Sequence, residues 1–151
     1  MEIRRPLQAV AVCVFLLVLG CGGGDDGGSS PTEPLPTADS LVIIRAEPSE
    51  GTALRRGSVV SFRVRVRYEM AQTTTGSVAA FAFSSSPSGP GIILTNPLLP
   101  ETRISGHRGE ADVSFSLTVP QAATEITVDL GLFPGNSDSS NVGDEITYST
   151  Q

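Results

Sequence analysis

The chain is poor in the residue types that build metal sites, disulfides and aromatic cores. Its 151 residues include no tryptophan, one histidine and two cysteines, and every basic residue is an arginine. Both cysteines, Cys13 and Cys21, lie near the start, so residues 22–151 hold none. A disulfide within that part of the chain is excluded, and a zinc site or a Cys–His pair lacks the second ligand or thiol that it needs. Its stability must come from burial of apolar side chains.

The chain also lacks an apolar run long enough to span a membrane as a helix. Its most apolar segment, residues 7–19, is interrupted only by Gln8. At about 1.5 Å per helical residue this segment would cover about 20 Å, whereas crossing about 30 Å of hydrocarbon takes about 20 residues. Arg4 and Arg5 precede it and Gly20 follows it. This order of charged, apolar and small residues is typical of a secretory signal peptide.

The end of this segment, Val18-Leu19-Gly20-Cys21, resembles the lipobox of bacterial lipoproteins, in which an aliphatic residue, a variable residue and Gly or Ala precede an invariant Cys. The resemblance implies that residues 1–20 are a lipoprotein signal peptide and that Cys21 is acylated. Two or more acyl chains hold a protein stably on a bilayer, so the membrane is the expected partner at Cys21. Gly22 in place of Asp favours the outer membrane, by resemblance to enterobacterial sorting rules. The alternative is an ordinary signal peptide without lipid.

The residues after Cys21 predict a flexible tether. Residues 22–37 contain five glycines and three prolines, and Leu35 is their only large apolar residue. Such a segment cannot bury enough surface to offset its ordering entropy, so we assign residues 21–37 to the lipidated cysteine and its linker. Removal of residues 1–20 takes away one acid and two arginines, which changes the formal charge from -6 to -7. An acidic chain argues against nucleic acid as a partner.

Residues 38–151 show the alternation of half-buried β-strands and no sustained helical period. The clearest strand is residues 59–68, where Val60, Phe62, Val64, Val66 and Tyr68 fall on one face. Clusters of Gly, Pro, Ser and Asn separate the strands, as they do in two-sheet antiparallel proteins. The other expected strands are residues 41–46, 77–83, 110–119, 125–133 and 145–149, with short ones near 92–94 and 102–105.

This order resembles that of bacterial immunoglobulin-like or fibronectin type III-like domains. The residues that carry the resemblance are Pro48 to Gly51, the segment from Gly57 to Tyr68, and Val119-Pro120. The resemblance implies an all-β fold, namely a single immunoglobulin-like antiparallel β-sandwich of about seven strands over residues 38–151. The antibody subgroup is excluded, because it requires a cysteine pair and a core tryptophan.

One outer face of such a sandwich carries charge. Arg63, Arg65 and Arg67 alternate with the core residues of their strand, and Glu110 and Asp112 do so on a strand expected to lie beside it. Opposite charges on neighbouring strands attract by about 0.2–1 kcal/mol per pair. We therefore interpret the row as a solvated ladder of ion pairs rather than as a site for a glycan or polyanion.

The other outer face is the candidate binding face for a protein partner. We expect the bulky set Ala79, Phe81 and Phe83 to point inward, which leaves weakly charged positions outside. A flat face with little charge is a candidate contact surface, unless a further strand or loop covers it. The face comprises Val78, Ala80, Ala82, Thr127, Gly131 and Phe133.

The loops offer weaker candidates. Residues 84–91 form the tip of a long proline-containing segment and are the best binding-loop candidate. Asn136, Asp138, Asn141, Asp144 and Glu145 bring oxygen atoms together, as calcium requires, but these types are also ordinary turn formers.

The sequence predicts no catalytic residue, no metal site and no cofactor. His107 lies among glycines and reads as a turn residue, and no Gly-x-Ser-x-Gly nucleophile motif is present. The leading hypothesis is a lipid-anchored cell-envelope protein that displays one immunoglobulin-like domain as a non-catalytic binding or structural module. The alternatives are a carbohydrate-binding accessory lipoprotein and an enzyme without a recognisable motif.

Overall fold

The computed structural model describes residues 33–135, 137–140 and 142–151, and these are built from nine β-strands. No helix in this part of the chain is long and apolar enough to span a bilayer. Two of the strands, β4 and β5, are only three and two residues long. The strands are β1 (Ser40–Glu47), β2 (Val59–Glu69), β3 (Thr75–Ser85), β4 (Gly91–Ile93), β5 (Thr95–Asn96), β6 (Glu101–Ser105), β7 (Arg108–Thr118), β8 (Glu125–Pro134) and β9 (Val142–Ser149).

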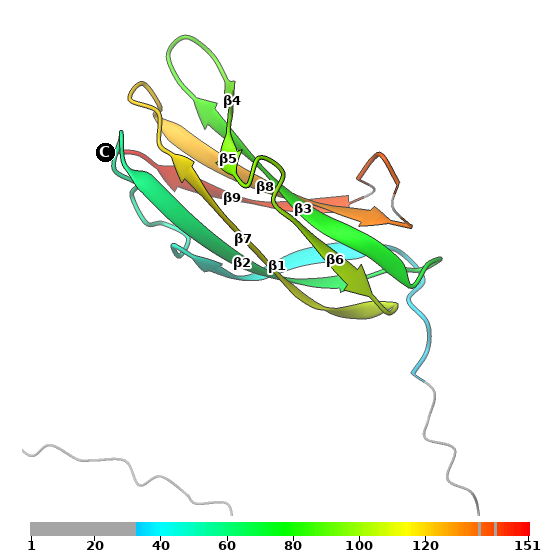
Figure 1. The fold of residues 1–151 in the computed structure, drawn as a ribbon. Helices are drawn as coiled ribbons and strands as arrows, with labels where there is room; N and C mark the ends of the chain where they lie inside the picture. Colours follow the sequence, from blue (N-terminus) through cyan, green and yellow to red (C-terminus); the bar gives the residue numbers. More distant parts are fainter. Residues whose placement is uncertain (1–32, 136, 141) are drawn as a thin grey trace, which may run out of the picture. The chain divides into compact units, whose positions relative to one another are not determined.

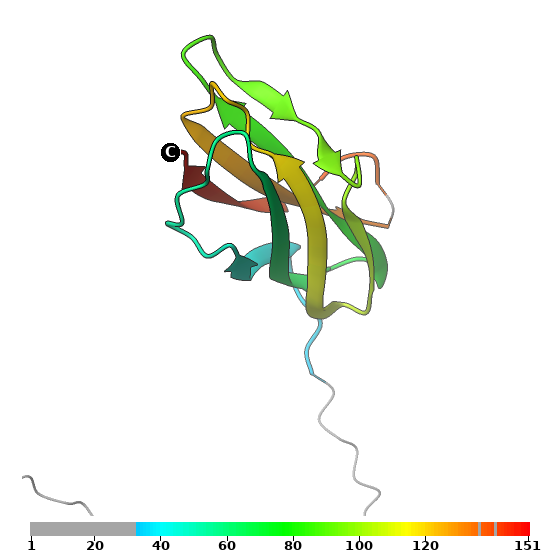
Figure 2. The same cartoon turned by 60° about the vertical axis from the view of Figure 1, so that its left-hand side comes forward.

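The strands form two antiparallel sheets that face each other as a sandwich (Figures 1 and 2). The first sheet has the order β1-β2-β7-β5. The second has β3-β8-β9, with β4 and β6 both paired to the free edge of β3. This order corresponds to the ABED and CFG sheets of an immunoglobulin domain. The predicted all-β immunoglobulin-like sandwich is therefore confirmed, with nine strands in place of about seven.

The segment between β3 and β7 crosses from one sheet to the other and back. β4 pairs with the end of β3, β5 pairs with β7 in the opposite sheet, and β6 returns to the start of β3. The short strands predicted near residues 92–94 and 102–105 correspond to β4 and β6, whereas β5 was not predicted. The buried hydroxyl of Thr95 donates to the carbonyl oxygen of Pro97 at 2.7 Å, which stabilises the turn that leaves the first sheet.

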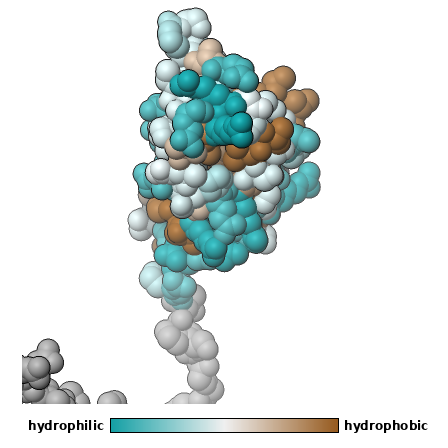
Figure 3. All heavy atoms as spheres, turned by 90° about the vertical axis from the view of Figure 1, so that its left-hand side faces the viewer, coloured by the Kyte–Doolittle hydropathy of each residue, from teal (hydrophilic) through white to brown (hydrophobic). Residues whose placement is uncertain are grey.

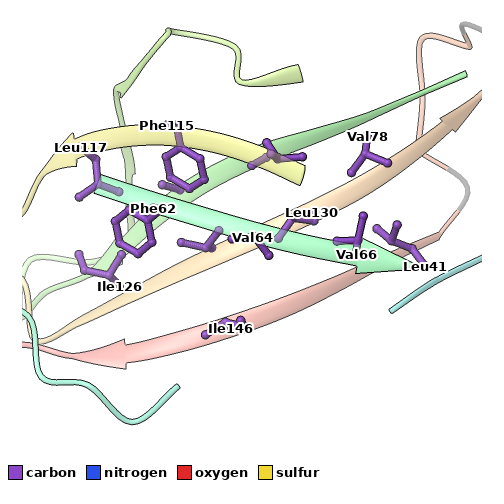
Figure 4. Packing of buried hydrophobic residues seen from close by; sticks show 14 of the residues in the cluster. Leu41, Phe62, Val64, Val66, Val78, Phe115, Leu117, Ile126, Leu130 and Ile146 are labelled. Atoms are coloured by element: carbon purple, nitrogen blue, oxygen red, sulfur yellow. The ribbon is translucent and has the colours of Figure 1, made fainter. Parts of the chain in front are cut away.

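The core lies between the sheets, where the strongly alternating strands place their apolar residues as predicted. The Phe62 ring of β2 stacks on the Phe115 ring of β7, with 5.1 Å between the ring centroids (Figure 4). It also meets the Tyr148 ring of β9 edge-on, at a centroid distance of 5.5 Å. The Tyr148 hydroxyl donates to the Pro48 carbonyl at 2.9 Å. Burial, together with the nearby Glu50 carboxylate, raises the pKa of Tyr148 to about 12. The phenol therefore stays neutral and keeps its proton for this bond.

The predicted orientation of β3 is wrong. Val78, Ala80 and Ala82 are 0%, 1% and 1% exposed and belong to the core, whereas Phe81 and Phe83 are 37% and 36% exposed on the outer face. Residues directly opposite each other on antiparallel strands point to the same side of a sheet. The buried Val128, Leu130 and Leu132 of β8 lie opposite Ala82, Ala80 and Val78, respectively. Pairing with β8 therefore buries the smaller set of β3 and exposes the aromatic one.

The open edges of the two sheets are joined by a side chain. The pairing of β1 with β2 skips Ile44, which is a β-bulge. Next to it, the backbone N–H of Ile43 donates to the Asp144 carboxylate of β9 at 2.8 Å, and the contact is partly buried. The carboxylate thus satisfies a backbone donor in the first sheet from a strand of the second sheet.

Replacement of this carboxylate tests the link between the edges. We expect Asp144→Ala to lower the free energy of unfolding by about 1–2 kcal/mol, because the Ile43 N–H loses its acceptor. Asp144→Asn, which keeps an oxygen at that place, should lose less than half as much. Urea denaturation of the three proteins measures this. Equal losses in the two variants would contradict the assigned hydrogen bond.

Candidate functional site

The outer face of the first sheet is a ladder of ion pairs, as the sequence predicted. Arg65 lies opposite Asp112, and Arg67 lies opposite Glu110. The Arg65 Nε and Nη2 atoms donate to the two Asp112 oxygens at 2.9 and 3.0 Å, and Arg63 Nη2 donates to the same carboxylate at 2.8 Å. These bonds hold the pKa of Asp112 well below its usual range. The arginines of this face are thus largely engaged by its own carboxylates.

The outer face of the second sheet is aromatic where the sequence suggested small residues. Phe81 and Phe83 of β3 and Phe133 of β8 all point to this side, and the rings of Phe81 and Phe133 lie 6.4 Å apart at 54°. Of the predicted face, Thr127 and Phe133 do lie on the outer side and are half-buried. Gly131 also lies on this side but is covered, since a Cβ added there would be 2.8 Å from Ser140 Oγ. Val78, Ala80 and Ala82 are in the core.

A pocket of about 360 Å³ opens on this aromatic face. Its base includes Ser77 and Ala79, two small residues of β3 that the structure nevertheless buries. Glu101 of β6 and Asp138 of the loop after β8 supply carboxylates at its walls, and the rings of Phe81 and Phe133 complete it. The sequence pattern of a single strand does not predict this pocket, because three separate segments of the chain form it, namely residues 77–81, residues 99–101, and residue 133 with residues 137–138.

An apolar ridge lies beside this pocket along the β4–β6 crossing. Ile92, Leu94, Leu98 and Leu99 are each more than half exposed. Figure 3 looks at the end of the domain that lies to the left in Figure 1, and brown apolar residues gather at its upper right, the side on which Figure 2 places β4 and β5. An exposed apolar cluster of this kind on a folded domain is a candidate contact surface.

The same face is acidic. Asp129 of β8 lies directly opposite Glu145 of β9. Burial, and then repulsion by Glu145, raises the pKa of Asp129. Like charges at opposite positions of a sheet destabilise it, so this pair costs the fold some stability at neutral pH.

The loop candidates have structural roles. In the predicted calcium loop, Asp144 accepts the Ile43 N–H and Glu145 faces Asp129, while Asn136 and Asn141 lie outside the described residues. The described part of the chain holds no group of three His, Cys, Asp or Glu side chains placed to bind a metal. Residues 84–91 form the tight connection between β3 and β4, where Ser86 Oγ donates to the Gly89 carbonyl at 2.8 Å.

The single histidine lies at a turn, as predicted, but it is half-buried. His107 follows Gly106, which has a φ of 92°. Its Nδ1 lies 2.8 Å from the Met70 carbonyl oxygen, and its own carbonyl accepts the Met70 N–H. These contacts fix the β6–β7 turn against the end of β2. Cys21 lies outside the described residues.

The Asp129–Glu145 pair predicts a pH-dependent stability. Because the folded state raises the Asp129 pKa, ionisation of this carboxyl opposes folding, and the cost appears as pH rises from the unfolded value of about 3.9 through the folded one. Asp129→Asn should therefore increase the free energy of unfolding at pH 7, and the gain should vanish at pH 3. Urea denaturation from pH 3 to 7 measures it, with exposed Glu125→Gln as the control. A gain that does not change with pH would refute the explanation.

Comparison with known proteins adds a distant likeness of fold. No protein-family model and no curated protein sequence matches the chain. Among solved structures, the chain is similar to the ASH/PapD-like domain of human CEP192 (PapD-like domain 7), at 13% sequence identity and a TM-score of 0.40. The match covers 86% of this chain and 96% of that one.

Proposed function

We propose that this protein is a lipid-anchored, non-catalytic binding module of the bacterial cell envelope, which presents the aromatic face of its second sheet to a protein partner. The observation that carries the proposal is the exposure of Phe81 and Phe83 on one side of the domain, with the half-buried Phe133 beside Phe81 and the apolar ridge next to them. A stable fold has no need to expose these rings, and exposed aromatic and aliphatic side chains are typical of the centres of protein interfaces.

The anchoring part rests on Val18-Leu19-Gly20-Cys21, the segment that resembles a lipobox. Lipid at Cys21 would hold the chain at a bilayer. The linker composition of residues 22–37 supports a module that can reorient toward its partner.

Substitution of the cysteine tests the anchor. In the full-length chain produced in a Gram-negative host, we expect Cys21→Ser to move the protein from the membrane fraction to the soluble fraction and to abolish labelling by a palmitate analogue. Cys13→Ser, which lies inside the predicted signal peptide, should leave both unchanged. Membrane retention of the Cys21→Ser protein would contradict the proposed anchor.

A second candidate is carbohydrate binding, which the paired rings of Phe81 and Phe133 favour. Sugar rings present apolar C–H faces that pack on exposed aromatic side chains, and their hydroxyls bond to carboxylates such as Glu101. A glycan array probed with residues 33–151 tests this candidate. It predicts binding that falls at least about tenfold in Phe81→Ala, whereas an array without signal above background removes it.

A further inference from the structure

We propose that the pocket bounded by Phe81, Phe133, Glu101 and Asp138 is a receptor for a cationic side chain of the protein partner, with arginine as its best ligand. The inference rests on the proposed binding function of this face and not on the lipid anchor. Three features of the described residues carry it: the shape of the pocket, its unneutralised carboxylates, and the charge difference between the two faces of the domain.

The shape follows from the residues at the base of the pocket. Ser77 and Ala79 of β3 are small, so the sheet surface is low at this point. The Phe133 ring extends back over Gly131, since a Cβ added to Gly131 would lie 3.0 Å from Phe133 Cε2. It thereby reaches the Phe81 ring at 6.4 Å. The two rings and the low base form a hollow of about 360 Å³, which is within the size range of protein ligand pockets and leaves room for a large side chain.

The carboxylates of the pocket form no ion pair with any of the described residues. The arginines of the described residues that form ion pairs are Arg45, Arg63, Arg65, Arg67 and Arg108. None of these pairs involves Glu101 or Asp138. An arginine that enters the pocket would meet both carboxylates without displacing an existing ion pair of the described domain.

The charge of the two faces points to the same ligand. The outer face of the first sheet carries five arginines and four carboxylates, namely Arg45, Arg63, Arg65, Arg67 and Arg108 against Glu47, Glu69, Glu110 and Asp112. The outer face of the second sheet, with the loop that borders the pocket, has one base, Arg103, against five acids. These acids are Glu101, Glu125, Asp129, Asp138 and Glu145. A net of four negative charges steers a cationic partner to this side.

Arginine fits the combination of rings and carboxylates better than other cations. Its guanidinium is planar, stacks on aromatic faces, and donates two parallel hydrogen bonds to a carboxylate. A quaternary ammonium of a lipid headgroup can lie against the rings but has no hydrogen to donate to Glu101 or Asp138. The apolar ridge at Leu98 and Leu99 then suits apolar residues next to the arginine in the same peptide.

A titration of residues 33–151, which contain every strand and the whole described core, tests the proposal. The probe is N-acetyl-Leu-Arg-Leu-amide, and the readout is the ¹H–¹⁵N NMR spectrum. We expect saturable shifts at the backbone amides of Ala79, Phe81, Glu101, Phe133 and Asp138. The matched peptide with citrulline, which keeps the shape without the charge, should bind at least about tenfold more weakly, a loss of about 1.4 kcal/mol.

Variants of the pocket measure separately how much its carboxylates and its aromatic rings contribute to binding of the arginine peptide. Glu101→Gln combined with Asp138→Asn should weaken the arginine peptide about tenfold, and Phe81→Leu should weaken it by several-fold. Glu125→Gln, on the same face but outside the pocket, should change it by less than twofold. Equal binding of the citrulline peptide, shifts that map elsewhere, or tighter binding of phosphocholine would each overturn the arginine site. If the peptide binds this face equally well when Glu101 and Asp138 are replaced, the proposed function stands and only the cation-binding pocket is refuted.

Discussion

The pairing of β3 with β8 is the constraint on which the rest of this domain depends. The inward face of β8 is unambiguous, since Val128, Leu130 and Leu132 are fully buried. The antiparallel register then assigns β3 its two faces, with Ala80 and Ala82 inside and the phenylalanines outside. A shift of one residue would reverse every side chain of β3. It would bury the rings, expose the alanines, and remove both the aromatic face and the pocket.

The two outer faces of the sandwich differ in chemistry as well as in charge. On the first sheet, Asp112 accepts hydrogen bonds from both Arg63 and Arg65, so the charges of the ladder are paired with one another. On the second, Asp129 faces Glu145 and the carboxylates of Glu101 and Asp138 form no ion pair within the described residues. A face that keeps repelling charges and exposed rings gives up some stability, and such a cost is typical of surfaces that bind a partner.

The sequence was sufficient where one side of a strand is apolar and the other is polar. Residues 59–68 and 110–119 alternate in this way, and both their inward faces and their ion pairs were predicted correctly. Residues 78–83 are apolar at every position, so the alternation carries no direction. Side-chain size was then the only local criterion, and it wrongly predicted that the phenylalanines face the core. The signal that decides the matter lies on β8, about fifty residues later, and depends on a register that no local pattern contains.

The site was less predictable than the fold because it is assembled from distant segments. The pocket needs β3, β6, β8 and the loop after β8 to meet, and β6 reaches its place through β5, a two-residue strand without a recognisable pattern. Phe133 was correctly predicted to lie outside, but its partner Phe81 was assigned to the core. The two rings could therefore be recognised as a pair only once the register of β3 was known.

Thiol accessibility tests this register most directly, because residues 22–151 contain no cysteine that would interfere. Single substitutions Ala82→Cys and Phe83→Cys place one thiol on each side of β3 in residues 33–151. The account predicts that the thiol at position 83 reacts with a maleimide at nearly the rate of an unfolded peptide, and that the thiol at position 82 reacts only when the domain unfolds. The reverse order would contradict the orientation of β3, and with it the aromatic face and the pocket.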